Sequence, residues 1–314
     1  MKTVFMGTPE FAVNSLERLV KEGYNIEAVV TQPNRPRGRG NRVQPPPVKT
    51  RAAAEGIPVM QPERVKDAEF INELKEIKPD IIIVVAFGQI LPPDLINLPP
   101  LGCINVHASL LPKYRGAAPI NWCIINGETK TGVTTMFMDE CMDTGDMLLS
   151  MAVDIDDDET AGQLHDRLAV MGAKLLVETI EGLKKGSLPR KAQDSKKATY
   201  APQLCRDTGR IDWSRDAKSI FNLIRGTDPW PGCYSHLNGK RIKLWKAKVL
   251  EEESRGTDGE IIAVKDEGMT VQTGKGSLLV TEIQVPSSRR MTAAEYIRGN
   301  TIKVKDMLGE KGHE

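Results

Sequence analysis

A polar pair near the end of one apolar segment could take part in acyl-group chemistry. Residues 103–107 are predicted to form a strand, on which Asn105 and His107 lie two positions apart and so face the same side of a sheet. The strand leads into a loop rich in proline and glycine, and open α/β sheets bind ligands beyond the carboxyl ends of their strands. Taken alone, the pair is equally typical of hydrogen-bonded structural residues.

An acidic turn, residues 139–146, follows the next predicted strand. Alone, such a turn is more typical of a solvated surface, since Asp and Gly favour turns. If the turn lies beside Asn105 and His107, the site combines a carboxylate with an amide and an imidazole. That set suits acyl transfer to an amine, because the amide and a protonated imidazole can hold an oxyanion while the carboxylate manages protons. No Ser or Cys lies in a recognisable nucleophile elbow, so we expect direct transfer from donor to acceptor.

Strands and helices alternate along residues 1–183, which predicts an α/β domain with a Rossmann-like, mostly parallel sheet covered on both faces. The predicted strands are residues 3–6, 26–31, 58–61, 81–86, 103–107, 133–138 and 147–153. The predicted helices are residues 11–20, 48–55, 70–77, 119–125 and 160–183. A short connection joins the last two strands, which predicts antiparallel additions at one edge of the sheet.

The composition and the hydrophobic periodicity of the sequence change after residue 183. Residues 184–205 hold six basic residues and one acidic residue with little periodicity, and we interpret them as a basic linker, for which plain solvation and contact with a partner are equally expected. Residues 206–314 contain several short strands separated by glycine, with Asn238-Gly239 as a hairpin signal. They predict a small C-terminal β-barrel.

Several function classes are excluded or disfavoured. The first turn reads Gly7-Thr8-Pro9-Glu10, without the glycine fingerprint of dinucleotide sites, and no phosphate-binding loop of the Gly-Lys-Ser/Thr type occurs. The four histidines are far apart, so no metal site is expected. The five scattered cysteines favour free thiols. The longest apolar run is too short to span a bilayer and no leader pattern is present, which predicts a cytoplasmic protein.

A longer signature surrounds the polar pair. The run Asn105-x-His107-x-Ser109-Leu110-Leu111-Pro112-x-x-Arg115-Gly116, followed by Asp143-Thr144-Gly145, resembles the signature of the 10-formyltetrahydrofolate-dependent formyltransferases. The N-terminal segment 4–12, the arginine-rich segment 31–40 and the C-terminal motifs at 211–213, 224–226 and 229–232 extend the resemblance over nearly the whole chain. Within this family the chain is most similar to the members that formylate methionyl-tRNA.

The resemblance implies specific roles. Asn105, His107 and Asp143 would be catalytic, and the folate would bind at two segments: Ser109, Leu110, Leu111 and Pro112, and the loop Phe87, Gly88, Gln89 and Ile90. Ordinary packing is an alternative for Leu110 and Leu111. Four arginines, Arg35, Arg37, Arg39 and Arg42, lie within eight residues and would contact a tRNA acceptor stem. A solvated basic loop is the alternative for them.

The implied function is formyl transfer from 10-formyltetrahydrofolate to methionyl-initiator tRNA by a monomeric cytoplasmic enzyme with an OB-like C-terminal barrel and no metal. The alternative is an N-formyltransferase acting on a sugar nucleotide or another small amine. A net charge of +1 opposes indiscriminate nucleic-acid binding. That charge is unevenly spread: residues 1–183 hold 18 basic and 25 acidic residues, and residues 206–314 hold 19 and 16. Local basic patches therefore leave room for one RNA partner.

Overall fold

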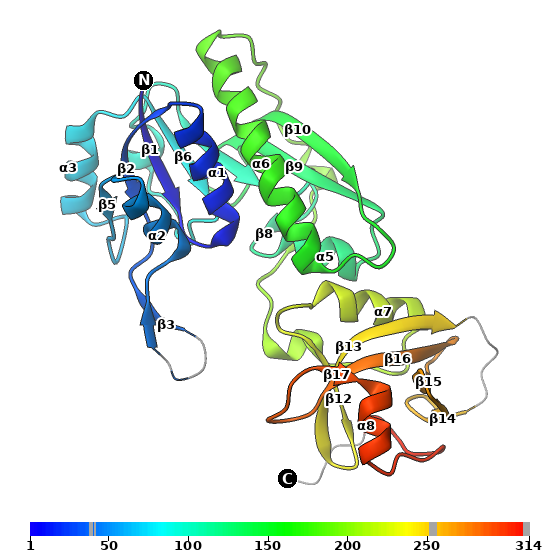
Figure 1. Ribbon diagram of the computed structural model, residues 1–314. Coiled ribbons are helices and arrows are strands. Elements are labelled where there is room, and N and C mark those ends of the chain that lie inside the picture. Colours follow the sequence, from blue (N-terminus) through cyan, green and yellow to red (C-terminus); the bar gives the residue numbers. More distant parts are fainter. Residues whose placement is uncertain (38–39, 41, 251–255, 310–314) are drawn as a thin grey trace. The chain divides into compact units, whose positions relative to one another are not determined.

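The chain forms two compact units in a computed structural model that describes residues 1–37, 40, 42–250 and 256–309 (Figure 1). Unit 1 comprises residues 1–119, 130–154 and 165–201, and unit 2 comprises residues 120–129, 155–164 and 202–314. Two segments that precede residue 165 therefore belong to unit 2.

A seven-stranded sheet forms the centre of unit 1, in the order β10-β9-β7-β6-β1-β2-β5. Its strands are β1 (Lys2–Gly7), β2 (Asn25–Val30), β5 (Val59–Met60), β6 (Ile81–Val85), β7 (Cys103–His107), β9 (Lys130–Phe137) and β10 (Met147–Asp154). The five strands from β5 to β7 pair in parallel, whereas β9 pairs antiparallel with both β7 and β10. The predicted class and the antiparallel addition at one edge are confirmed.

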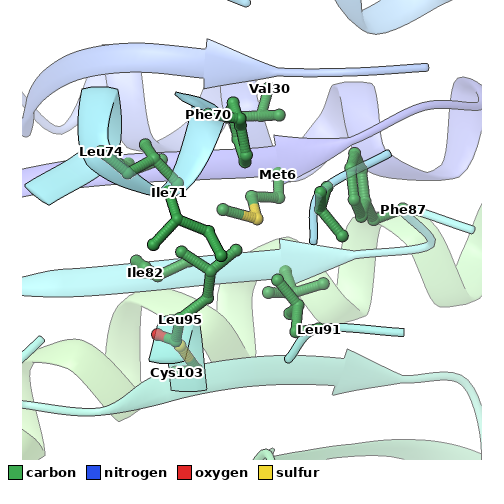
Figure 2. Packing of buried hydrophobic residues seen from close by; sticks show 13 residues of the cluster. Met6, Val30, Phe70, Ile71, Leu74, Ile82, Phe87, Leu91, Leu95 and Cys103 are labelled. Atoms are coloured by element: carbon green, nitrogen blue, oxygen red, sulfur yellow. The ribbon is translucent and has the colours of Figure 1, made fainter. Parts of the chain in front are cut away.

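Helices cover this sheet, and α1 and α3 each bury an apolar stripe. They are α1 (Glu10–Lys21), α2 (Pro47–Ala54), α3 (Ala68–Ile77), α4 (Pro93–Ile96) and α6 (Ala161–Lys184). Figure 2 shows Phe70, Ile71 and Leu74 of α3 packed with Met6 of β1 and Ile82 of β6. Helix α6 lies over β7 and β9, where Thr179 and Thr135 share a hydrogen bond of 2.7 Å between their Oγ1 atoms.

Two short strand pairs of unit 1 were not expected from the sequence. Strands β3 (Arg35–Arg37) and β4 (Arg42–Gln44) form an antiparallel pair where the sequence predicts a loop. Strand β8 (Arg115–Gly116) pairs in parallel with β11 (Tyr200–Ala201), which lies within the predicted linker. A 3-10 helix, η1 (Ser195–Lys197), precedes β11.

Unit 2 is built on an antiparallel sheet in the order β12-β13-β16-β15-β14, with β17 paired to β16. The strands are β12 (Cys233–Leu237), β13 (Lys240–Leu250), β14 (Ile261–Lys265), β15 (Gly268–Gln272), β16 (Ser277–Gln284) and β17 (Met291–Thr292). The helical elements are α5 (Pro119–Ile125), η2 (Arg206–Gly209), α7 (Ala217–Gly226) and α8 (Ala293–Gly299). The predicted Asn238-Gly239 hairpin is confirmed, since Leu237 pairs with Lys240.

Candidate active site

Asn105 and His107 lie at the carboxyl end of β7, at the sheet edge where the parallel strands β1 and β6 also end. Between them, Val106 packs beneath α6, where a Cβ at Gly172 would lie only 2.9 Å from Val106 Cγ1. Because side chains alternate across a strand, Asn105 and His107 both face away from α6. His107 is only 6% exposed, so its ring position is fixed by its surroundings.

The carboxylate of Asp143 reaches both of these side chains from the turn between β9 and β10. Its Oδ1 atom accepts a hydrogen bond from Asn105 Nδ2 at 3.4 Å and lies 3.7 Å from His107 Nδ1. Its Oδ2 atom accepts from the Gly116 amide at 2.8 Å. The structure therefore brings the three residues of the expected catalytic trio together around one carboxylate, although Asn105 and Asp143 lie 38 residues apart in the sequence.

The turn that carries Asp143 has an unusual backbone. Asp143 has a φ of 56°, in the left-handed region that Asp tolerates better than most residues. Gly145 fits against β9 so closely that a Cβ there would lie 1.9 Å from the Phe137 carbonyl oxygen. Thr144 Oγ1 donates to the Asp139 carboxylate at 2.7 Å, which closes the turn from the other side. The glycine and the acidic residues of segment 139–146 thus shape the turn that presents Asp143.

The ring of His107 lies between two oxygen acceptors. Nε2 is 2.9 Å from the Tyr114 carbonyl oxygen, which can only accept, so Nε2 must donate. Nδ1 then faces Asp143 Oδ1, and this contact is attractive when Nδ1 also carries a proton. The ring is therefore held by the Tyr114 carbonyl oxygen on one side and faces the Asp143 carboxylate on the other, an arrangement that can exchange a proton with a reacting amine.

Two polar residues support the turn that carries Asp143, Gln193 directly and Arg115 through Gln193. The sequence did not single out either one as a site residue. Gln193 Nε2 donates to the carbonyl oxygens of Asp143 and Gly145, each at 2.8 Å. Its Oε1 atom accepts from Arg115 at 3.0 Å from Nε and 2.8 Å from Nη2. Arg115 belongs to the formyltransferase signature at 105–116, so the sequence held a signal that could have identified it. Gln193 lies in a segment without periodicity, 50 residues beyond Asp143, and nothing in the sequence marks it.

The first expected folate segment directly follows β7 and is anchored on β9. Thr134 Oγ1 donates to the Ser109 carbonyl oxygen at 2.7 Å and accepts from the Leu111 amide at 3.3 Å. Ser109 and Leu111 are buried, whereas Leu110 and Pro112 are partly exposed. Ser109 Oγ also donates to the Lys113 carbonyl oxygen at 2.6 Å, so its side chain serves the loop's own structure.

The second expected folate segment follows β6 at the same edge of the sheet. Phe87 is buried in the core, and its carbonyl oxygen accepts from Thr8 Oγ1 at 2.8 Å. Gln89 binds the backbone of segment 63–65 through both ends of its amide, which is a structural role. Gly88 is exposed with a φ of 88°, and Ile90 is 72% exposed. Gly88 and Ile90 are thus the members of this loop that are open to a ligand.

Three of the four arginines expected to contact tRNA lie on strands β3 and β4, which follow β2: Arg35, Arg37 and Arg42. Arg35 and Arg42 are exposed, and the backbone of Arg37 pairs with that of Arg42. Arg39 lies outside the described residues. Val43 beside them is 65% exposed, so the hairpin presents an apolar side chain together with its charges.

Metal-ligating side chains and thiols are the other groups with possible chemistry. The part of the chain that the structure describes contains no group of three His, Cys, Asp or Glu side chains arranged to hold a metal ion. None of its helices is both long and apolar enough to cross a membrane. All five cysteines are free, and burial raises the pKa of Cys103, at the start of β7, to about 12, so this thiol is no nucleophile at neutral pH.

Two protein-family models match this chain. A family model described as formyl transferase matches residues 1–180, and one described as formyl transferase, C-terminal domain, matches residues 203–301. Methionyl-tRNA formyltransferase of Acetivibrio thermocellus is 50% identical over 99% of this chain and 100% of its own. That of Clostridioides difficile is 52% identical over 98% and 100%.

Solved structures share the fold at lower identity. The N-formyltransferase from Helicobacter canadensis, solved with folinic acid and dTDP-3-aminofucose, is 21% identical with a TM-score of 0.68 over 89% of this chain and 98% of its own. HypX from Aquifex aeolicus, solved with tetrahydrofolic acid, is 19% identical with a TM-score of 0.64, and this chain spans 47% of its length. With relatives about half identical over nearly all of both chains, the chain belongs to the methionyl-tRNA formyltransferase family.

Proposed function

We propose that the protein transfers the formyl group of 10-formyltetrahydrofolate to the α-amine of methionyl-initiator tRNA, giving N-formylmethionyl-tRNA for translation initiation. The observation that carries this proposal is the convergence of Asn105, His107 and Asp143 at the sheet edge of a chain belonging to this family. Reactions of this type need an oxyanion donor and a proton acceptor at one carbon, and this constellation supplies both.

The trio divides the work of the reaction. The acceptor nitrogen bonds to the formyl carbon, the bond from that carbon to the donor nitrogen breaks, and one proton passes from the acceptor amine to the donor nitrogen. An amide nitrogen has two hydrogens, so Asn105 Nδ2 can face Asp143 with one and the formyl oxygen with the other. The Asp143 carboxylate, 3.7 Å from His107 Nδ1, can take up the travelling proton from the acceptor amine and release it to the donor nitrogen.

For the folate, we propose the sheet edge formed by the loops after β6 and β7. Ile90 offers an exposed apolar side chain, and Gly88 leaves its backbone open, since a Cβ there would meet only Gln32 Nε2, at 3.9 Å. A flat pterin with amide-like edges suits apolar side chains beside open backbone groups. Ser109, Leu110, Leu111, Pro112, Phe87 and Gln89 would then shape and support the two loops.

For the tRNA, we propose contact with the arginine-rich segment 35–42 through Arg35, Arg37, Arg39 and Arg42. Exposed arginines bind phosphate oxygens through their planar guanidinium groups, which suits an acceptor stem. We keep residues 1–183 as the catalytic region, 184–205 as a basic linker and 206–314 as a tRNA-binding region. We further propose a monomer acting in the cytoplasm, which sedimentation and cell fractionation would test.

An acceptor comparison tests the proposal. Purified protein is given the folate donor and either methionyl-initiator tRNA or a nucleotide-linked amino sugar, and formylated product is measured. We expect turnover with the charged tRNA and only background with the sugar. Turnover restricted to the sugar would overturn the assignment and establish the alternative, which the fold of the Helicobacter canadensis enzyme makes worth including.

A further inference from the structure

The segment of residues 187–201, called here the return segment, runs back along the candidate site. Lys191 and Met147 exchange backbone hydrogen bonds of 2.9 and 3.0 Å, and the Ala118 amide donates to the Ala201 carbonyl oxygen at 3.2 Å. Strand β11 at its end pairs with β8, inside the signature loop. The sequence predicts a linker here, yet this segment forms hydrogen bonds with both loops that frame His107 and Asp143.

On the Asp143 side, the contact is made by Gln193. Its amide donates both hydrogens to carbonyl oxygens in the turn, and its own oxygen accepts twice from the guanidinium of Arg115. A flipped amide would set an NH2 group against that guanidinium and an oxygen against two carbonyls. Only one orientation is therefore stable, and Arg115, which is 3% exposed, fixes it.

On the His107 side, the contact is made by Thr199. Its Oγ1 atom accepts from the Tyr114 amide at 2.8 Å, and its carbonyl oxygen accepts from the Arg115 amide at 2.9 Å. Tyr114 has a φ of 60° and supplies the carbonyl oxygen that holds His107 Nε2. Both Tyr114 and Asp143 thus hold left-handed conformations that non-glycine residues rarely adopt, and the return segment braces each one.

We propose that Gln193, oriented by Arg115, is a positioning residue for Asp143: it fixes the left-handed turn so that the carboxylate stays aligned with His107 and Asn105. This inference rests on the proposed catalytic role of Asp143. Displacing a reacting group by about 1 Å can lower the rate about 100-fold, so hydrogen bonds that hold the turn in place should affect kcat.

The test compares Gln193→Ala with the parent and with Ser195→Ala, an exposed control two residues away in the same segment. We expect Gln193→Ala to lower kcat roughly 10- to 100-fold with both KM values within about twofold, since the alignment of Asp143 is disturbed while substrate binding is not. Hydrogen exchange at the Gly116 amide, which donates to Asp143 Oδ2, should accelerate.

A double variant separates positioning from general destabilisation. In an Asp143→Asn background, Gln193→Ala should cost little further activity, because the group that it positions is already disabled. An equal loss in both backgrounds would overturn the proposal, and so would a kcat of folded Gln193→Ala within about twofold of the parent.

A second substitution covers poor folding of the first. Gln193→Glu keeps the pairing with Arg115 but sets a carboxylate against two carbonyl oxygens, so we expect folded protein with the same kinetic loss. Unchanged turnover of this variant would also contradict the proposal. If the parent protein failed to formylate tRNA, the proposed function would be wrong. The positioning role of Gln193 would then be tested by comparing the same variants with whichever amine acceptor the parent does formylate.

Discussion

At the scale of single residues, the site depends on where one proton lies. The Tyr114 carbonyl oxygen commits His107 Nε2 to donating, which leaves Nδ1 to face Asp143. A carboxylate in that position can receive a proton from a reacting amine. Asn105 completes the arrangement by binding the same carboxylate oxygen. Replacing any one of the three therefore disturbs the other two.

Removing the charge of Asp143 tests this arrangement. We expect Asp143→Asn to lower kcat at least about 100-fold, because an amide cannot take up the proton and can turn its NH2 group toward His107. His107→Ala should lose a similar factor. Glu140→Gln, an exposed change in the same turn, serves as the control and should retain activity. Single-turnover formylation rates measure the effect, and near-normal turnover by either site variant would show that the trio is assigned wrongly.

The sequence predicted that Asn105, His107 and the acidic turn would supply one site, but not the residues that support Asp143, for a physical reason. Asn105 and His107 share a strand face, and the acidic turn follows a strand, so their types and local spacing carry information. Gln193 has no local pattern, since its role comes from tertiary contacts with residues 48, 50 and 78 positions away. The left-handed backbone of Asp143 is equally invisible beforehand, because it is held by contacts from other segments.

At the scale of elements, short pieces of structure present the functional groups. The β3–β4 pair turns a stretch that reads as a basic loop into a hairpin with exposed Arg35 and Arg42. The sequence could not show the pairing, because Pro and Gly interrupt any alternation in residues 35–44. Regular elements such as β7 and α3 were predicted within a residue or two, since apolar patterns dominate there.

Neutralising the hairpin should change the salt dependence of tRNA use. For the double variant Arg35→Ala and Arg42→Ala, we expect a higher KM for tRNA and a shallower dependence of log(kcat/KM) on log salt, by about 0.7–0.9 for each phosphate that is no longer neutralised. The folate KM should stay unchanged. Arg64→Ala, at another exposed arginine of unit 1, is the matched control. An unaltered salt slope would favour the alternative, in which these arginines are solvated and do not contact tRNA.

Helix α7 offers a titration test at its N-terminus. Hydrogen bonds from the Ser219 side chain and backbone lower the pKa of Asp216, which caps the helix at 2.9 Å from the Ser219 amide. A lowered carboxyl pKa stabilises the fold above the unfolded-state value, and this stabilisation is lost as the pH falls through the folded-state value. Asp216→Asn keeps a good cap but cannot ionise. We expect its Tm to fall less between pH 5 and pH 3 than that of the parent, by roughly a few degrees.

The control for this experiment is Asp266→Asn, in an exposed turn of the same unit. Its acid dependence should match that of the parent. An Asp216→Asn protein whose Tm falls with pH as steeply as the parent's would contradict the proposed link between the cap and acid stability.

At the scale of the whole molecule, unit 2 is assembled from three stretches of chain. Arg225, 6% exposed on α7, joins two of them by donating to the carbonyl oxygens of Asp156 at 3.1 Å and Glu159 at 3.2 Å. Burial lowers the pKa of this guanidinium, and the acidic residues around Asp157 oppose the change. The apolar patterns predicted elements of unit 2, but not the recruitment of residues 120–129 and 155–164.

Replacing this buried arginine should therefore loosen unit 2. We expect Arg225→Met to lower the free energy of unfolding by about 2–3 kcal/mol, because two carbonyl oxygens are deprived of a charged donor. Arg298→Met, on the exposed side of α8, should change it by less than about 0.5 kcal/mol. Urea unfolding followed by tryptophan fluorescence measures both, and equal stabilities would show that Arg225 does not secure the segment.

The interleaving of the two units also constrains how the protein is made. On the ribosome, residues 120–129 and 155–164 emerge long before the strands of unit 2 that complete their surroundings. These early stretches can complete their packing only after residues from 202 onward have been synthesised. Synthesis of the last third of the chain therefore completes unit 2. A C-terminal fragment expressed from residue 202 would lack residues 120–129 and 155–164 of that unit.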